Sequence, residues 1–264
     1  INFNGMAITL QSENGAATTI IDGSQSATVI ELSSGEGANS VIDGFTVQNG
    51  SAGVGGGIHC GSSTAASSPT IRNCVITGNT ATGTGGGIYC MNGSSPSLDD
   101  CTFAYNTAGN EGGGMYCEDS SAMLLENCTF TGNMSSSDGA GMYCKGSSAT
   151  LKNCSFTNNT AHASGAGGGI GFYDIDDSLI LEDCTFTDNW AAWGGGGVYC
   201  SSASPTLENC TFIGNTTDGS GGGFYIKGGT SSITDTLLSE CVFEDNYSSV
   251  DGGGMYCEDS STEI

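Results

Sequence analysis

Three aspartates that could take part in catalysis, Asp174, Asp176 and Asp177, lie together in the segment GGGIGFYDIDDS. Glycoside hydrolases need two carboxyl groups on opposite sides of the bond that they cleave, so this cluster is the candidate for such chemistry. Lyases that act on acidic sugars need a strong base and cations, and the chain has only four basic residues. The sequence therefore favours a protein that is not an enzyme, with a carbohydrate-active enzyme as the alternative.

The second group of reactive side chains consists of 13 cysteines in two regularly spaced columns. Phe172 and Ile226 replace a cysteine of the first column, while Cys184 and Cys241 of the second column remain in those repeats. Both replacements are apolar, which indicates that the position needs a buried filler. We expect mostly reduced, packed cysteine columns rather than regular disulfide bridges. Without a CxxC pair we expect no metal cluster, whereas calcium remains possible for so acidic a chain.

Aromatic residues form the third group, because one follows nearly every glycine block at the same position. Strand alternation would point these side chains away from the interior, where they could bind a glycan or a protein or simply stack on one another. Two tryptophans at a corner could extend such a surface. The candidate binding residues are Tyr89, Tyr116, Tyr143, Tyr199, Tyr225, Tyr256, Trp190 and Trp193.

An internal repeat must position all of these residues. Eight glycine blocks, such as GGGIYC and GGGMYC, recur every 26 to 31 residues, and each of seven repeats has a second landmark such as ENCTFTGN. An asparagine closes the second landmark in every case. We expect these side chains to form a hydrogen-bonded ladder between successive coils. The ladder residues are Asn79, Asn106, Asn133, Asn159, Asn189, Asn215 and Asn246.

Each repeat contains short segments in which apolar and polar residues alternate, a pattern typical of strands. A unit this short cannot bury its own apolar face, but units stacked on one another can. The sequence therefore predicts an all-β, right-handed parallel β-helix (a solenoid) of about ten coils of roughly 27 residues. We expect one domain over 1–264, with cysteine-free coils in 1–52 and cysteine-containing coils in 53–264. Both ends interrupt the pattern, so we also expect a segment of a longer chain.

These motifs and their spacing resemble the repeats of a known group of proteins. The FxxN and GGx[aliphatic] pairs, here Phe130 to Asn133 followed by Gly139 to Met142, are similar to the repeats of polymorphic outer-membrane proteins and of bacterial right-handed β-helix repeat proteins. The resemblance covers nearly the whole chain. It implies the coil architecture, which carries adhesins, lyases and hydrolases alike.

Composition and charge limit the kinds of partner that the chain can bind. With 28 acidic and 4 basic residues the net charge is −24, which repels phosphate backbones, so we expect no nucleic-acid partner. No apolar run is long enough to span a membrane. The sequence favours an extracellular or cell-surface protein with a structural or adhesive role, which presents a repetitive surface or self-associates into a filament or sheath. Its partners would be a glycan, a protein surface or copies of itself; a carbohydrate-binding module is the further alternative.

Overall fold

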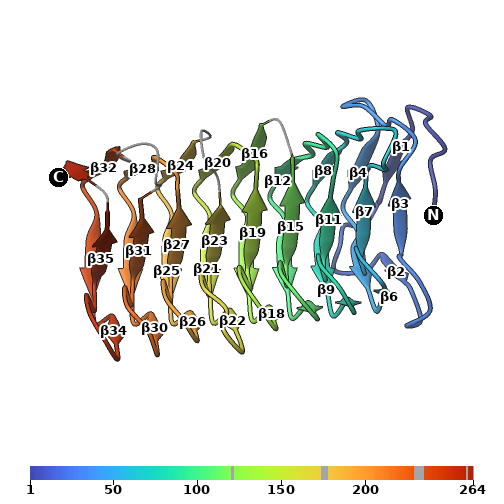
Figure 1. The fold of residues 1–264 in the computed structure, drawn as a ribbon. Coiled ribbons are helices and arrows are strands. Elements are labelled where there is room, and N and C mark those ends of the chain that lie inside the picture. Colours follow the sequence, from blue (N-terminus) through green and yellow to red (C-terminus); the bar gives the residue numbers. More distant parts are fainter. Residues whose placement is uncertain (120–121, 174–177, 229–234, 260, 264) are drawn as a thin grey trace.

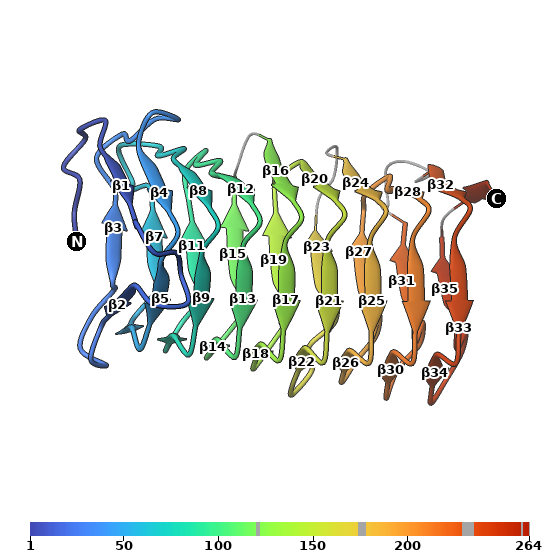
Figure 2. The same ribbon diagram turned by 180° about the vertical axis from the view of Figure 1, so that it is seen from behind.

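The computed structural model shows a parallel β-helix whose coils follow one another along a single axis (Figure 1). It describes residues 1–119, 122–173, 178–228, 235–259 and 261–263. Over these residues the chain consists of short strands and turns, and no helix long enough to cross a membrane occurs among them. The N-terminal and C-terminal coils lie at opposite ends of the molecule, as the view from behind also shows (Figure 2).

The strands form four sheets, which we call A to D. Sheet A contains β3 (Ile30–Leu32), β7 (Ile58–Cys60), β11 (Ile88–Cys90), β15 (Met115–Glu118), β19 (Met142–Lys145), β23 (Ile170–Tyr173), β27 (Val198–Ser201), β31 (Phe224–Lys227) and β35 (Met255–Glu258). Sheet B contains β1 (Thr9–Gln11), β4 (Val41–Asp43), β8 (Thr70–Arg72), β12 (Ser97–Asp99), β16 (Met123–Glu126), β20 (Ala149–Lys152), β24 (Leu179–Glu182), β28 (Thr206–Glu208), β32 (Asp235–Ser239) and β36 (Ser261–Glu263).

The other two sheets close the coil. Sheet C contains β2 (Ile20–Asp22), β5 (Thr46–Gln48), β9 (Val75–Thr77), β13 (Thr102–Ala104), β17 (Thr129–Thr131), β21 (Ser155–Thr157), β25 (Thr185–Thr187), β29 (Thr211–Ile213) and β33 (Val242–Glu244). Sheet D contains β6 (Ser51–Ala52), β10 (Thr80–Ala81), β14 (Thr107–Ala108), β18 (Met134–Ser135), β22 (Thr160–Ala161), β26 (Trp190–Ala191), β30 (Thr216–Thr217) and β34 (Tyr247–Ser248).

The strands of successive coils pair in parallel and in register. Tyr116 lies opposite Tyr143, for example, and Cys117 lies opposite Cys144. The predicted parallel β-helix is therefore confirmed. The predicted count of about ten coils is slightly high: eight coils, from β4–β7 to β32–β35, contain all four strands, and the coil before them has no strand in sheet D. The strands are too short to be stable in a single coil. Stability comes from stacking, because each coil buries its apolar face only against the neighbouring coils.

Aromatic rings fill the interior beside sheet C. Each ring lies 4.5 to 5.1 Å from the next and nearly parallel to it. The spacing of the rings follows the spacing of paired strands, so in-register pairing by itself produces the stack. The stacked residues are Phe103, Phe130, Phe156, Phe186, Phe212 and Phe243.

The predicted asparagine ladder is confirmed at the corner between sheets C and D. Asn133 is representative: its Nδ2 donates to Asn159 Oδ1 at 2.9 Å and to the Phe103 carbonyl at 2.9 Å. Its backbone N–H also donates to Asn159 Oδ1, at 3.0 Å. The same pattern repeats from Asn79 to Asn246. The side chains from Asn79 to Asn215 are fully buried, so the ladder satisfies polar groups that water cannot reach.

The glycine blocks are needed where the chain turns into sheet A. Gly112 has φ 68°, a conformation that glycine adopts without strain. Gly141 has an ordinary conformation, but a Cβ atom there would lie 2.5 Å from the Gly169 carbonyl oxygen of the next coil. The block thus combines one left-handed residue with positions at which adjacent coils come too close for a side chain.

Candidate functional site

The tyrosines on the outer side of sheet A form a stack. Tyr89, Tyr116 and Tyr143 lie with ring centroids 5.2 Å apart and nearly parallel planes. Towards the C-terminal coils the rings of Tyr199, Tyr225 and Tyr256 follow edge to face, 5.1 and 5.0 Å apart. The predicted direction of these side chains, away from the interior, therefore agrees with the structure.

Most of these tyrosines do not form an accessible surface, so of the two alternatives the stacking one describes them better. Tyr116, Tyr143, Tyr199 and Tyr225 expose only 3 to 8% of their surface, while Tyr89 and Tyr256 are half-buried. The turns before the strands cover the rings: a Cβ at Gly112 would lie 2.7 Å from Tyr116 Cβ. Alternation predicts only the side of the sheet from which a residue projects, and these turns supply the cover.

Tyr173 fills the one gap in the stack and was missed from the sequence. Gly171 occupies the tyrosine position in β23 and has no ring. Tyr173 lies two residues further on, hence on the same side of the strand, and its ring centroid is 5.2 Å from those of both Tyr143 and Tyr199. The motif GIGFY therefore moves the ring along the strand without interrupting the stack.

Trp193 is the exposed aromatic residue on this stack. Its ring lies 5.5 Å from the rings of Tyr199 and Tyr225, nearly parallel to the second, and Lys227 Nζ is 5.9 Å from its centroid. Trp193 nevertheless exposes 44% of its surface. These contacts come from residues of β27 and β31. Trp190 instead belongs to β26 of sheet D, where it contacts His162, and it is not part of the tyrosine stack.

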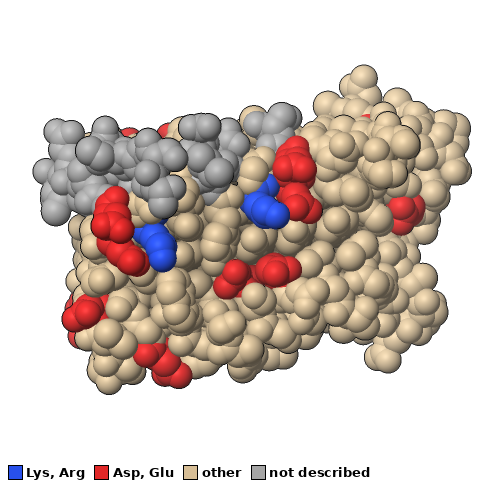
Figure 3. Space-filling view, viewed as in Figure 1, with Lys and Arg blue, Asp and Glu red and all other residues tan. Residues whose placement is uncertain are grey.

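Charged side chains lie beside Trp193, whose ring with those of Tyr199 and Tyr225 we call the Trp193 platform, and along other coils. Glu258 accepts a hydrogen bond from the Tyr225 hydroxyl and lies 3.8 Å from Lys227 Nζ. The other three basic residues are also paired with carboxylates: Arg72 with Asp43, Lys145 with Glu118, and Lys152 with Glu182. Figure 3 shows this face with basic side chains beside acidic ones and wide uncharged areas between them. Since each cation already has a partner, this face offers little to attract an anionic polymer.

Two carboxylates that the sequence did not single out lie on neighbouring coils beside the tyrosines. The Gly112 N–H donates to the Asp138 carbonyl, which places Glu111 next to Asp138. The Asp138 carboxylate accepts from the Ala166 N–H at 2.7 Å and from the Tyr173 hydroxyl. Burial raises the pKa of both carboxyl groups, and the charge of Asp138 raises the pKa of Glu111 further. No sequence motif marks this pair, because its members come from different repeats.

This pair makes stability depend on pH. The folded chain retains protons on Glu111 and Asp138 that the unfolded chain loses near its ordinary pKa values of 4.5 and 3.8. We therefore expect the contribution of this pair to stability to fall as pH rises from about 4 towards neutral, since the folded state binds more protons at these two groups in that window. Asp138→Asn retains an acceptor for the Ala166 N–H, so the thermal midpoint of the variant relative to that of the wild type should rise with pH across this range. A difference between the two midpoints that does not change with pH would contradict this prediction.

The twelve cysteines from Cys60 to Cys241 are free thiols that pack in columns, as expected. Eleven are buried, Cys241 is half-buried and Cys257 is exposed. Cys60, Cys90, Cys117 and Cys144 face the interior from sheet A, in register. The second column lies at the corner between sheets B and C, where each Sγ also hydrogen-bonds to backbone carbonyls. It contains Cys74, Cys101, Cys128, Cys154, Cys184, Cys210 and Cys241.

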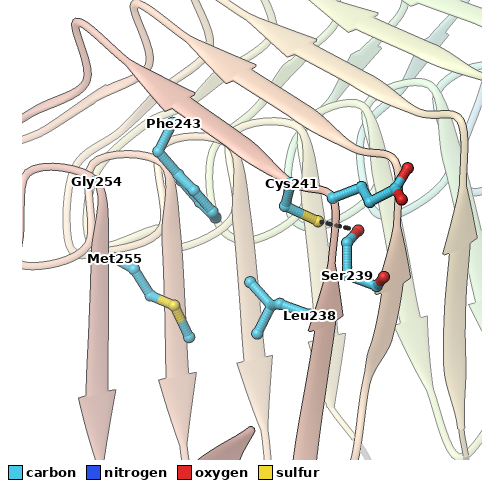
Figure 4. A pocket seen from close by; sticks show the side chains of 7 residues that line it. Leu238, Ser239, Cys241, Phe243, Gly254 and Met255 are labelled. Atoms are coloured by element: carbon cyan, nitrogen blue, oxygen red, sulfur yellow. Dashed lines mark hydrogen bonds between the residues drawn. The ribbon is translucent and has the colours of Figure 1, made fainter. Parts of the chain in front are cut away.

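A hollow of about 490 Å³ opens at the coil formed by β32–β35. Its lining includes Leu238, Cys241, Phe243 and Met255, which converge on the interior from three sheets (Figure 4). The Cys241 thiol donates to the Ser239 carbonyl at 3.4 Å. The hollow thus belongs to the coil interior, and its lining contains one thiol and one thioether.

The predicted aspartates Asp174, Asp176 and Asp177 lie outside the described residues. Within the ranges that the structure describes, no three or more histidine, cysteine, aspartate or glutamate side chains converge on a metal position. The residues brought together are therefore the tyrosine stack, the Trp193 platform, the carboxylate pair and the two thiol columns.

Four stacked parallel sheets with an internal asparagine ladder define a parallel β-helix, a solenoid in which each coil contacts only its neighbours. The family described as "Right handed beta helix region" matches residues 4–161 and 87–264, two overlapping stretches that together span nearly the whole chain. The chain belongs to this family. Comparison with curated proteins and with solved structures gave no match.

Proposed function

We propose that the chain is a structural and adhesive β-helix of the cell surface or extracellular space, and that it binds a neutral carbohydrate at Trp193. The exposure of 44% of the Trp193 surface supports the proposal most strongly. An indole ring held from beneath by Tyr199 and Tyr225 presents a rigid flat surface to the apolar C–H face of a sugar ring. Lys227 and Glu258 beside it offer groups that can hydrogen-bond to sugar hydroxyls.

Two further observations favour a rod-like support. The asparagine ladder is continuous from Asn79 to Asn246, and the phenylalanine stack continues into the coil formed by β32–β35. Such columns resist bending between coils, which suits a protein that holds a binding site away from a surface. The finer similarity, to the repeats of polymorphic outer-membrane proteins, is part of this proposal. Protease shaving of intact producing cells would test the location: an intracellular chain would survive it.

Replacing Trp193 by alanine tests the binding site. Aromatic packing of this kind contributes about 1.4 kcal/mol, so we expect Trp193→Ala to weaken binding to a neutral polysaccharide about tenfold. Trp190→Ala is the matched control, because that ring lies on sheet D, and it should change affinity less than twofold. Isothermal titration with a panel of neutral and acidic polysaccharides gives both values. Failure of the wild type to bind any polysaccharide, or equal losses in the two variants, would refute the proposal.

The buried tyrosines of the stack should behave differently. Tyr143 and Tyr199 are buried, so their replacement by serine should lower the free energy of unfolding rather than remove a contact with the ligand.

The enzyme alternative rests on Asp174, Asp176 and Asp177. Turnover of a polysaccharide that is lost on Asp176→Asn would establish it, and would displace the purely adhesive role. A filament of stacked copies would appear as ordered polymers of the purified chain in electron micrographs.

A further inference from the structure

The two thiol columns form continuous runs of sulfur through the interior. In sheet A the run from Cys60 to Cys144 consists of four thiols on four successive coils, at positions that lie opposite one another in register. At the corner between sheets B and C, the run from Cys74 to Cys241 consists of seven thiols on seven successive coils. There the backbone N–H that follows each cysteine from Cys101 onward donates to the cysteine carbonyl of the preceding coil. Nothing in the proposed function uses these thiols.

We propose that each run binds soft monovalent cations, with Cu(I) as the type ion, in two-coordinate sites between the sulfurs of neighbouring coils. Thiolate is the ligand that selects Cu(I), whereas the carboxylates of this chain would suit calcium or magnesium. The first run has three intervals between neighbouring sulfurs and the second has six. The chain would therefore hold nine cations when both runs are filled.

The spacing of the coils favours this arrangement. Paired strands repeat about every 4.8 Å, and equivalent sulfurs repeat with them. Two metal–sulfur bonds of about 2.3 Å each span nearly that distance, so a cation fits between sulfurs that hardly move. A disulfide needs the same sulfurs about 2 Å apart, with a torsion that side chains pointing in the same direction do not reach.

The charges also balance. Each Cu(I) that binds displaces one thiol proton, and an inner sulfur bridges the cations on both sides of it. A filled run of seven sulfurs and six cations has lost six protons, so the run carries no net charge. An uncharged chain of this kind avoids the large penalty for burying isolated ions. Loss of the Cys128 proton does not leave its carbonyl partner unpaired, since the Glu126 carbonyl also accepts from the Asp100 N–H.

The hollow at the coil formed by β32–β35 lies at one end of the second run. Cys241 is the last member of that run and lines the hollow together with the Met255 thioether (Figure 4). Thioethers and thiolates both bind soft cations. The net charge of −24 raises the local concentration of cations at the surface as a whole.

Anaerobic titration of the reduced chain with Cu(I), buffered by a competing chelator, tests this proposal. Cys257→Ser serves as the parent protein, because it removes the exposed thiol. We expect about nine Cu(I) per chain, release of one proton per cation, and an X-ray absorption spectrum with two sulfur neighbours per copper. Uptake of one copper or none, or a spectrum with nitrogen or oxygen neighbours, would overturn the proposal.

Two buried cysteines provide a matched pair of variants. Cys128 lies inside the second run, so Cys128→Ala removes two intervals and should lower the uptake from nine to seven. Cys200 is equally buried, but its register neighbours are Phe172 and Ile226, so Cys200→Ala should leave nine. Equal uptake by the two variants would also overturn the proposal. Far-UV circular dichroism checks that both variants fold, and a variant that does not fold is replaced by the corresponding valine substitution.

Discussion

Replacing Asn159 by alanine is expected to lower the free energy of unfolding by at least about 3 kcal/mol. The Asn159 side chain accepts from the N–H and the Nδ2 of Asn133, and it donates to the Phe130 carbonyl. Its removal takes from the buried Asn133 N–H the side-chain acceptor that pairs it, and an unpaired buried donor costs about 1 to 3 kcal/mol. Asn133 Nδ2 keeps the Phe103 carbonyl but loses one hydrogen bond, as does the Phe130 carbonyl, and each lost bond costs about 1 kcal/mol. Urea unfolding followed by far-UV circular dichroism measures the change, provided that the slope with denaturant stays constant.

The residue before it is the matched control. Asn158 is exposed and has φ 55°, so Asn158→Gly keeps a permitted backbone conformation and should change stability by no more than about 0.5 kcal/mol. Asn246→Ala should lie between the two, because that asparagine is only partly buried and water can reach the groups it leaves. If Asn159→Ala were no worse than Asn158→Gly, the ladder would not be the stabilising element that its hydrogen bonds indicate.

Phe156→Ala is expected to have the second large effect, a loss of about 3 to 5 kcal/mol. The ring is fully buried, 4.6 Å from that of Phe130 and 5.1 Å from that of Phe186. Alanine would leave a cavity that the stacked coils cannot close, because their spacing is fixed by hydrogen bonds between backbones. The same urea experiment gives the value.

Two further substitutions show whether the loss of stability depends on the volume of the ring or on its position in the stack. Phe156→Leu keeps most of the side chain and should cost less than about 1.5 kcal/mol. Phe243 is half-buried and lines the hollow of the β32–β35 coil, so Phe243→Ala creates less new empty space. A loss in Phe243→Ala as large as that in Phe156→Ala would mean that central burial does not govern the phenylalanine stack.

The repeat carried most of the information about the fold. Recurrence of the glycine block and of the asparagine predicted the coil, the parallel register and the ladder, since equivalent residues of stacked coils must lie above one another. The replacement of Cys by Phe172 and Ile226 correctly indicated a buried filler position. These inferences needed only periodicity and residue type.

The candidate site depended on contacts that periodicity does not describe. Alternation placed the tyrosines on the outer side of sheet A, but the turns that cover Tyr116 and Tyr143 became apparent only in three dimensions. Trp190 and Trp193 are three residues apart in the sequence, yet one lies on sheet D and the other on the tyrosine stack. Glu111 and Asp138 are separated by a whole repeat, and no local motif links them.

The sequence by itself therefore determined the architecture, because every coil repeats the same local rules and stacking copies them along the axis. The tertiary structure alone decided which outward side chains reach solvent, which carboxylates share a neighbourhood and which thiols form unbroken runs. These properties depend on the exceptions to the repeat, such as Gly171, Tyr173 and Trp193. The environment of an exceptional residue is set by the coils above and below it, and no single repeat specifies that environment.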